Sequence, residues 1–414
     1  MSININTIKI LLIVSLLGSF GSGIYIGANV DPNTSWSYYL TKNPDEQNSV
    51  TSISDDGNYF VIGSGNDRLY LFSRNNSKPL WIWRSNDDIY SVDISGDSNF
   101  ILAGDSDITA RLFERNSATP IWDFNSGTSG GRVAISSDGE YSAVCSFYKL
   151  YLYQRSLATL LIDGANAGDH VKISSQGDFI VSFNFMGGII YLFNKFNSVP
   201  IWLYNTGDVL YDLAITPTGE FIVTGGQAYD SSGFKLFLFN SSSSTPKIMY
   251  TESVIRAVAI SQDGDYIAAG CPDGIYLFNS SNLTKIWKYS FPIYGDTHTI
   301  AMSDNGDYIV ANLWRDPLDG EINRILIFNK VSNTTITVLE TESMVNDIAI
   351  SSDGNHISVA TQQRAYYINL KNPNIPNIDN PVQIKPVIIS LSTGATMGVV
   401  IFGILIYFIK FRKH

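Results

Sequence analysis

The sequence predicts an all-β chain: an eight-bladed β-propeller with four-stranded blades, followed by a C-terminal transmembrane helix. Two observations lead to this prediction. One unit recurs eight times along the chain, at intervals of 38 to 48 residues. Near the C-terminus, 23 consecutive residues from Val387 to Ile409 carry no charge.

The clearest part of the repeat is a strand that ends in Ile-Ser, followed by an Asp/Gly turn and an aromatic residue. The first copy reads Ile53-Ser-Asp-Asp-Gly57-Asn-Tyr59. Glycine adopts a positive φ without penalty and the preceding Asp or Asn bonds its own backbone, so the chain reverses as a hairpin. The turn position is Gly in seven copies and Ser98 in the second; the glycines are Gly57, Gly139, Gly177, Gly219, Gly264, Gly306 and Gly354.

Three further strands complete each copy. The second strand follows the turn, as in Tyr59–Gly63, Tyr141–Cys145 and Tyr266–Gly270. The third ends on an aromatic residue, as in Leu69–Phe72, Ile189–Phe193, Phe234–Phe239, Ile275–Phe278 and Ile325–Phe328. The fourth is centred on Trp and often opened by Pro, as in Pro79–Trp81, Pro120–Trp122, Pro200–Trp202 and Ile286–Trp287. No stretch of the repeat region has a convincing helical period, and four short strands per copy are typical of a propeller blade.

The two ends of the repeat region predict how the ring closes. Ser35–Tyr38 precedes the first copy and has the character of an isolated fourth strand. The last copy ends at its third strand, Ala365–Leu370. The N-terminal strand is therefore predicted to complete the final blade, which leaves no open sheet edge between the first and last blades.

The repeat resembles two related propeller families. Its Asp-Gly hairpin is similar to that of WD-repeat proteins, although their Trp-Asp pair at the end of the third strand is missing, and Trp122-Asp123 lies in a fourth strand. The Pro-x-Trp element and the eightfold count are more similar to quinoprotein-type (PQQ-like) repeats. The resemblance covers residues 34–372. A quinoprotein dehydrogenase would imply a vicinal disulfide and a calcium site, and two cysteines in different copies exclude that disulfide.

The chain ends predict a membrane protein. We divide the chain into a signal peptide or signal anchor (1–30), the propeller (31–371), a Pro/Asn-rich stalk (372–386), a transmembrane helix (387–409) and a basic cytoplasmic tail (410–414). A helix of 23 residues at about 1.5 Å per residue is long enough to cross a bilayer, and Lys410, Arg412 and Lys413 hold its end in the cytoplasm. A cleaved signal gives one membrane pass and an uncleaved signal two, and both place the propeller outside the cell.

Within the predicted transmembrane helix, Gly394 and Gly398 are four residues apart. This spacing lets two helices approach closely, so a helix-mediated homodimer is a further hypothesis.

Composition and charge exclude one class of partner. The net charge is −11, and no basic cluster occurs except at the C-terminus, so nucleic acid is not predicted as a partner. The two cysteines, Cys145 and Cys271, belong to the third and sixth copies, each near the end of the same strand type. They are predicted to be small core residues rather than a disulfide.

A search for catalytic and metal-binding residues gives no constellation, and no cofactor is predicted. The four histidines, His170, His298, His356 and His414, have no zinc-type spacing. His356 occupies the aromatic position of its copy and is predicted to be a core residue. His170 and His298 lie just before first strands, where they are expected at the mouth of the ring and could reach a ligand.

The copies differ most between the second and third strands. The fifth copy carries Tyr229 and Asp230 there, and the seventh carries Trp314, Arg315, Asp316, Asp319 and Glu321. Such loops share one rim with the connections between blades, and binding surfaces are common on loops of this kind. Trp314 with Arg315 is a candidate hot spot. The three acids miss the spacing of a calcium loop, and a tolerated surface insertion is the alternative interpretation.

Six Asn-x-Ser/Thr sequons mark possible glycosylation sites: Asn33, Asn75, Asn240, Asn279, Asn282 and Asn333. Composition alone gives about six by chance. Five of the six are predicted between third and fourth strands, on the rim opposite the variable loops. Glycans there would leave the variable rim bare.

The leading functional hypothesis is a cell-surface binding or scaffold propeller that recognises a protein or surface polymer through the variable rim. An extracytoplasmic enzyme with a site at the central channel is the second hypothesis. A ligand-sensing ectodomain is the third, and it requires a partner membrane protein because the predicted cytoplasmic tail is so short.

Overall fold

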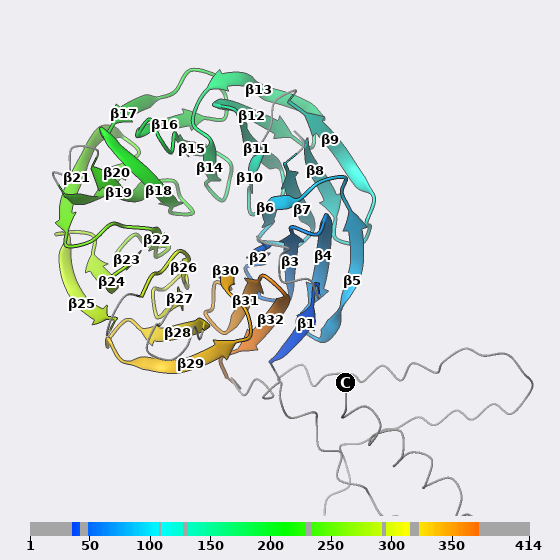
Figure 1. Cartoon of the computed structure of the whole chain (residues 1–414). Coiled ribbons are helices and arrows are strands. Elements are labelled where there is room, and N and C mark those ends of the chain that lie inside the picture. The colour runs from blue at the N-terminus through cyan, green and yellow to red at the C-terminus, as the bar shows by residue number, and fades with distance from the viewer. Residues whose placement is uncertain are drawn as a thin grey trace, which may run out of the picture. The chain divides into compact units, whose positions relative to one another are not determined.

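Eight four-stranded antiparallel sheets surround a central axis in the computed structural model of the chain (Figure 1). The structure describes residues 35–41, 49–106, 109–126, 131–228, 233–291, 295–314 and 323–371. The first strand of each blade lies nearest the axis and the fourth lies at the circumference (Figure 1). The predicted count of eight four-stranded blades is confirmed.

The inner two strands of the blades have the following bounds. The first strands are β2 (Ser49–Ile53), β6 (Ile89–Ile94), β10 (Arg132–Ile135), β14 (His170–Ile173), β18 (Asp208–Ile215), β22 (Ala257–Ile260), β26 (Ile300–Met302) and β30 (Val345–Ile350). The second strands are β3 (Tyr59–Ser64), β7 (Phe100–Asp105), β11 (Tyr141–Ser146), β15 (Phe179–Phe183), β19 (Phe221–Ala228), β23 (Tyr266–Cys271), β27 (Tyr308–Leu313) and β31 (His356–Thr361).

The outer two strands agree with the predicted segments to within a few residues. The third strands are β4 (Arg68–Ser73), β8 (Thr109–Glu114), β12 (Lys149–Gln154), β16 (Ile189–Asn194), β20 (Phe234–Asn240), β24 (Gly274–Asn279), β28 (Asn323–Asn329) and β32 (Arg364–Asn369). The fourth strands are β5 (Asn76–Arg84), β9 (Pro120–Asn125), β13 (Thr159–Asn166), β17 (Trp202–Asn205), β21 (Ser243–Thr251), β25 (Thr284–Ser290), β29 (Thr335–Thr341) and β1 (Trp36–Tyr39).

The N-terminal strand closes the ring, as predicted. β1 pairs with β32 in the register Trp36↔Tyr367 to Tyr39↔Arg364 and so becomes the fourth strand of the last blade. In Figure 1 the blue first strand lies beside the orange last one. The last blade is thereby built from both ends of the described chain.

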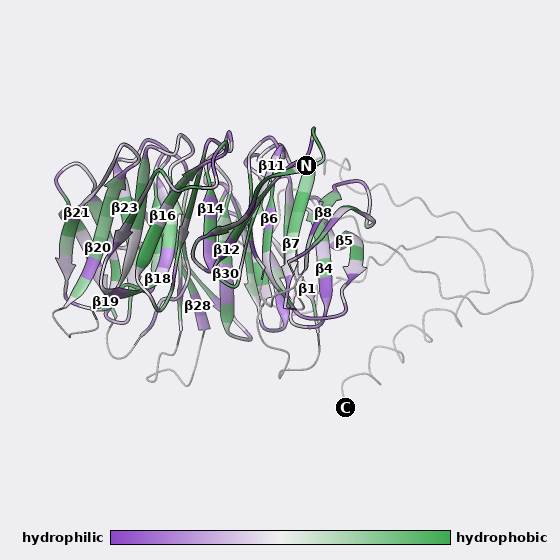
Figure 2. Ribbon diagram, turned by 90° about the horizontal axis from the view of Figure 1, so that it is seen from above, coloured by the Kyte–Doolittle hydropathy of each residue, from purple (hydrophilic) through white to green (hydrophobic). Residues whose placement is uncertain are grey.

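Burial follows the position of each strand in its blade. Second strands are buried on both faces, as in β3 and β11, because neighbouring blades cover them. Fourth strands alternate between exposed and half-buried residues, as in β5 and β29, because one face meets solvent. Figure 2 shows the strands running between two rims.

We name the two rims by the connections that they carry. The turn rim carries the turns from first to second and from third to fourth strands. The loop rim carries the connections from second to third strands and from one blade to the next. An antiparallel blade puts alternate connections at opposite ends, so every blade follows this rule.

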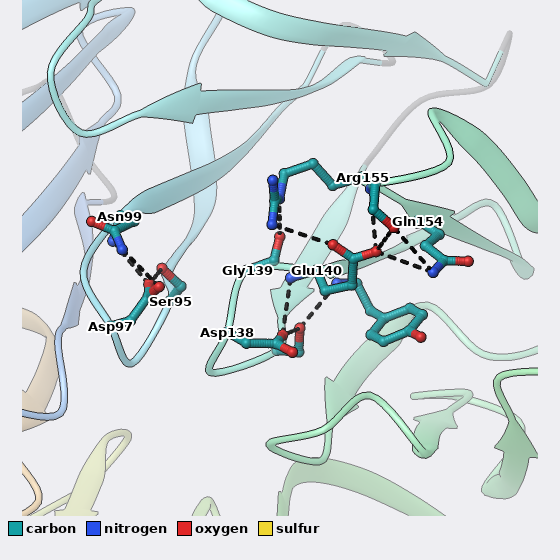
Figure 3. Close-up of polar contacts among 11 residues, drawn as sticks. Ser95, Asp97, Asn99, Asp138, Gly139, Glu140, Gln154 and Arg155 are labelled. Carbon is teal, nitrogen blue, oxygen red and sulfur yellow. Dashed lines mark hydrogen bonds and ion pairs between the residues drawn. The ribbon is translucent and has the colours of Figure 1, made fainter.

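The turn rim is built from one repeated hydrogen-bond pattern (Figure 3). Ser95 Oγ donates to Asp97 Oδ1 at 2.6 Å, and the same oxygen accepts from the backbone N–H of Asn99 at 3.0 Å. In the next blade Ser136 and Glu140 bond Asp138 in the same way, at 2.6 and 3.0 Å. The Asp of the repeat therefore holds its turn from both sides.

Each aromatic residue that follows a turn packs on the next blade. A Cβ added at Gly139 would lie 2.2 Å from the Phe100 ring of the preceding blade. Arg155 lies over that ring, 4.2 Å from its centroid, and its Nε donates to the carbonyl of Gly139. The glycine is therefore required twice, for its φ of 68° and for the space that the ring occupies.

The tryptophans of the fourth strands fasten neighbouring blades. The indole N–H of Trp81 donates to the carbonyl of Arg115 in the next blade at 2.7 Å. Trp202 and Trp287 make the equivalent bonds to Ser241 and Lys330, both at 2.9 Å. A Trp in the outer strand thus combines apolar burial with one directed bond across the junction.

A chain of backbone hydrogen bonds links the first turns around the ring. Seven such bonds join the described blades, beginning with Asp55 N–H to Gly96 O at 3.2 Å and ending with Ser352 N–H to Asp55 O at 3.0 Å. The junction between the fifth and sixth blades lacks one, because Pro217 occupies the donor position and has no N–H.

The predicted signal, stalk, transmembrane helix and tail, including Gly394 and Gly398, lie outside the described residues. Among the residues that the structure describes, no helix is long and apolar enough to cross a membrane.

Candidate functional site

A channel of about 660 Å³ runs along the axis and is lined by the first strands of the blades. Alternate residues of a strand face the same side, so every second residue of each first strand faces the channel. One layer consists of Ser52, Asp93 and Lys172 with the small residues Ala214, Ala259, Ala301 and Ala349. The next layer toward the loop rim carries larger polar groups, among them Arg132, His170, Asp212, Thr299 and Asp347.

Three carboxylates in the channel hold neighbouring blades together. Asp93 accepts from the backbone N–H of Ile135, Asp212 from that of Val258 and Asp347 from that of Thr51, all at 2.9 Å. Each acceptor thus satisfies an N–H on the inner edge of the next blade, where no further strand pairs. These carboxylates have a structural role at the junctions.

Local irregularities in the strands place these carboxylates. The register shifts between Ile89 and Ser91 in β6, between Leu210 and Asp212 in β18, and between Val345 and Asp347 in β30. These three strands are also the first strands that carry the three aspartates. A β-bulge re-aims the side chains that follow it, which accounts for the carboxylates facing the neighbouring edge.

The pKa values of the carboxyl groups predict a stability maximum at mildly acidic pH. Burial raises the pKa of Asp93, Asp212 and Asp347 above the ordinary 3.8. As pH rises from 3.8 through these raised pKa values, the folded state loses stability. The reason is that ionising these buried carboxyl groups costs more free energy in the folded protein than in the unfolded chain. Burial would also raise the pKa of the turn residues Asp97 and Asp353, but hydrogen bonds from serine, asparagine and the backbone outweigh it and lower the pKa. The stability that these two turn carboxylates contribute is lost as pH falls below 3.8 through their lowered pKa values.

Urea unfolding midpoints measured from about pH 2 to pH 8 will check this expectation. The change Asp353→Asn serves as the control, because Asn305 already fills the same turn position in the seventh blade and accepts from Ser303 and the N–H of Asp307. The variant should fold, and its urea unfolding midpoint should decline less at low pH than that of the wild-type chain. A midpoint that rises steadily from pH 4 to pH 8 would contradict the raised pKa values.

At the loop rim, the channel opens between aromatic and cationic side chains. We call Tyr90, Arg132, His170, Tyr211, Arg256 and His298 the channel mouth. The Arg132 guanidinium lies 5.5 Å from the centroid of the Tyr90 ring, and that of Arg256 lies 4.6 Å from the Tyr211 centroid. Each pair joins two adjacent blades, because each tyrosine precedes its arginine by one repeat.

Two buried polar atoms at the channel mouth lack partners. Within the described ranges, the Tyr90 hydroxyl and Arg256 Nε make no hydrogen bond. The nearest carboxylate oxygen to Arg256 Nε is Asp296 Oδ2, at 4.0 Å. Burial raises the pKa of Tyr90 to about 12, so its hydroxyl keeps its proton and is a potential donor. A buried polar group without a partner in the protein is a position where a bound molecule gains a hydrogen bond without displacing one.

The two histidines predicted at the mouth both lie there. His170 bonds Asp169 at 3.0 Å and stacks on Phe183 with a centroid distance of 4.5 Å. His298 Nε2 lies 3.1 Å from Asp296 Oδ2, and its ring meets the Trp314 ring edge-on at 5.0 Å. His356, predicted to be a core residue, is 7% exposed and stacks on Tyr367.

Of the residues predicted on the variable loops, the structure describes Trp314 alone. Its backbone exchanges two hydrogen bonds with Asp296, at 2.9 and 3.0 Å, which places its ring at the channel mouth. Tyr229, Asp230, Arg315, Asp316, Asp319 and Glu321 lie outside the described residues and stay predictions.

Sequence reasoning missed Tyr90, Arg132, Tyr211, Arg256 and the channel residue Lys172. An alignment of the eight first strands offers a signal for them. At the positions of Arg132 and Lys172, the other blades mostly carry small, apolar or acidic residues, such as Val50, Ala214 and Ala259.

Five sequons lie on the turn rim, as predicted. Asn75, Asn240, Asn279, Asn282 and Asn333 all fall at or within turns between third and fourth strands. Asn240 and Asn279 each accept from the N–H two residues later, a turn that Asn194 and Asn329 make without a sequon. These asparagines therefore have a structural reason to be there, and glycosylation stays a prediction. Asn33 lies outside the described residues.

Cys145 and Cys271 are free and fully buried, as predicted for core residues. Burial raises the pKa of both thiols. Among the described residues, no group of three or more His, Cys, Asp or Glu side chains could hold a metal ion.

Fold and repeat pattern together define an eight-bladed β-propeller. Residues 77–114 and 246–277 match the model of the WD40 family, described as WD domain, G-beta repeat. Each match runs from the fourth strand of one blade through the third strand of the next. The likeness to PQQ-like repeats stays a prediction.

Solved structures share the fold. The crystal structure of the C-terminal WD40 domain of Sif2 is similar, with a TM-score of 0.62 and 14% sequence identity, over 78% of this chain and 95% of that one. At this identity the likeness shows the fold alone. No curated protein matches the sequence.

Proposed function

We propose that the chain is a protein-binding scaffold whose binding surface is the loop rim around the channel mouth. WD40 propellers are typically scaffolds for protein interactions and are usually not enzymes. The observation that supports this site most directly is the channel mouth, where stacked aromatic and cationic groups surround two buried polar atoms without partners. Aromatic and arginine side chains are the residue types that contribute most to binding at protein interfaces.

The contrast between the two rims supports the same choice. The turn rim repeats the Ser–Asp turn in five blades and the packing of an aromatic or histidine ring on a glycine in seven, so its residues are committed to the fold. At the loop rim, residues equivalent by repeat differ from blade to blade. Variation on a fixed scaffold is typical of a binding surface.

The proposal includes attachment to the cell surface. Support comes from the sequence: 23 uncharged residues, Val387–Ile409, are followed directly by Lys410, Arg412 and Lys413. Protease treatment of intact cells tests this part. Digestion of the propeller without cell lysis would agree with it, and full protection until lysis would contradict it.

Site-specific photo-cross-linking in the native type of host tests the binding surface. A photoreactive amino acid replaces His298 at the channel mouth or Leu157, an exposed residue of the turn rim in the third blade. We expect a discrete cross-linked protein from position 298 and none from position 157. Cross-linking from position 157 alone would place the binding surface on the turn rim and contradict the proposal.

The cross-linked protein, identified by mass spectrometry and purified, is then titrated against the chain. The double variant Tyr211→Ala/Arg256→Ala removes one aromatic–cation pair from the mouth and should weaken binding by about tenfold or more. Equal affinity for the variant and the wild-type chain would contradict the proposed site.

A further inference from the structure

The turn between β11 and β12 at the loop rim of the third blade is strained. The register Ser146↔Lys149 leaves Phe147 and Tyr148 as a two-residue hairpin loop, with φ angles of 46° and 62°. Turns of this type favour Asn-Gly, because both central residues need a positive φ. A residue with a bulky side chain is disfavoured in this region, because its Cβ lies too close to the neighbouring backbone carbonyl oxygen.

Packing does not offset the strain of this turn. Phe147 is 62% exposed and Tyr148 is 43% exposed. Among the described residues, the aromatic ring that each of them contacts is that of the other, at a centroid distance of 5.6 Å. Two large apolar side chains are therefore held in solvent by an unfavourable backbone, an arrangement that is found mainly where the side chains act on something outside the fold.

Hydrogen bonds connect this turn to the channel mouth. The carbonyl of Tyr148 accepts from the N–H of Ala167 at 2.9 Å, in the connection to the fourth blade. In the same connection, Asp169 accepts from the N–H of Phe185 at 3.0 Å. The Phe185 ring in turn meets the Tyr211 ring edge-on at 5.5 Å, and the neighbouring Met186 is 57% exposed. We call Phe147, Tyr148, Phe185 and Met186 the aromatic ridge.

Cations accompany the aromatic ridge. Lys149 follows the strained turn and donates to Asn166 Oδ1 at 2.6 Å. Arg132 and Lys172 are exposed and line the adjacent part of the channel. In the described part of the chain, none of these three cations has a carboxylate oxygen within ion-pair distance, although the whole chain carries a net charge of −11. The charges of Lys149 and Arg132 are therefore available to an anionic partner, whereas Lys172 also interacts electrostatically with the channel carboxylates Asp93, Asp212 and Asp347.

We propose that the aromatic ridge and these three cations dock an acidic segment of a partner protein. Apolar side chains of the segment pack on Phe147, Tyr148 and Met186, and its carboxylates reach Lys149, Arg132 and Lys172. This inference rests on the proposed function and adds the chemistry of the partner. A peptide segment fits better than an anionic membrane, because Arg132 and Lys172 line the channel, where a flat bilayer does not reach.

The double variant Phe147→Asn/Tyr148→Gly separates function from stability. It installs the residues that the turn geometry favours and removes two of the three aromatic residues of the ridge. We expect its thermal midpoint to rise by about 2 °C or more, while peptide binding falls by about tenfold or more. A turn kept for structural reasons would show the opposite, a lower midpoint.

The binding probe is a displayed library of random short peptides, selected against the purified full-length chain. Enriched peptides should combine Asp or Glu with aromatic or aliphatic residues. Single synthetic peptides from the enriched set are then titrated against each variant. The variant Arg132→Gln/Lys149→Gln should bind them more weakly and with less dependence on salt.

A matched control lies in the same blade on the turn rim. Leu157 is 64% exposed and Ala158 has a φ of 48°. The variant Leu157→Asn/Ala158→Gly makes the same kind of change there and should leave peptide binding unchanged. Any loss of binding in this control would show that the effect of the ridge variant is not local.

Three outcomes would overturn the inference. The first is enrichment of peptides without an acidic bias. The second is unchanged binding by the ridge variant together with loss in Tyr211→Ala/Arg256→Ala, which would leave the proposed function intact. The third is the absence of peptide binding combined with sedimentation on phosphatidylserine vesicles but not on phosphatidylcholine vesicles, which would identify a membrane as the partner.

Discussion

Replacing Trp36 by alanine is expected to destabilise the propeller by about 3–5 kcal/mol. Trp36 is 4% exposed and packs against Phe60, Phe72 and Tyr367 at centroid distances of 5.5–5.7 Å. Its indole N–H donates to the carbonyl of Arg74 at 2.9 Å. The residue thus joins the strand that closes the last blade to the first blade. Urea unfolding followed by tryptophan fluorescence and circular dichroism measures the loss.

Trp287→Ala is the matched comparison, because Trp287 makes the equivalent bond to Lys330 at a junction inside the continuous chain. Both variants lose a large buried ring, but only Trp36→Ala weakens the closure of the ring. Limited proteolysis should therefore cut near the N-terminus in Trp36→Ala and not in Trp287→Ala. A loss below about 1 kcal/mol for Trp36→Ala would show that closure does not depend on this contact.

Blade number and ring closure could be predicted because both follow from the repeat itself. The turn needs a positive φ, which Gly supplies in seven blades, and in five blades an Asp accepts from the backbone N–H two residues later. The same logic makes the isolated strand around Trp36 recognisable, since it carries the Trp of a fourth strand without the three strands before it. The repeat therefore predicts both the four-stranded blades and the isolated N-terminal strand that completes the last of them.

The channel mouth could be predicted only in part. His170 and His298 were recognised from their place before first strands. The pairs Tyr90–Arg132 and Tyr211–Arg256 were not, because their partners stand one repeat apart and no local pattern joins them. The bulges that set the positions of the channel carboxylates also leave no clear trace in composition. Non-local pairing of this kind needs the three-dimensional register.

The strained turn at Phe147 and Tyr148 shows a different limit. Sequence rules identify a hairpin from residues that favour it, such as Asn-Gly. Here the strands on both sides, β11 and β12, impose the turn on residues that disfavour it. A rule based on favourable residues misses such a site, although its departure from the rule is what marks it in the structure.

Gly57→Ala is expected to destabilise the ring by about 3 kcal/mol, through backbone strain and steric overlap together. Gly57 has a φ of 65°, and a Cβ there would lie 2.4–2.6 Å from Cδ2, Cβ and Cγ of His356. The imidazole cannot swing away without loss, because Nε2 accepts from Arg74 at 3.0 Å and Nδ1 bonds the Tyr367 hydroxyl at 2.7 Å. Burial, the largest influence, lowers the pKa of His356 and keeps the ring neutral, as acceptance from Arg74 requires.

Gly207→Ala separates the two contributions. Gly207 has a similar φ of 70°, but nothing lies within 4 Å of the added Cβ. Its replacement should cost the backbone strain alone, about 1 kcal/mol. The difference between the two variants, measured by urea unfolding, then gives the cost of displacing His356. Equal losses would show that the turn glycines serve only the backbone. A clear excess for Gly57→Ala would show that this glycine also makes room for the His356 side chain of the preceding blade.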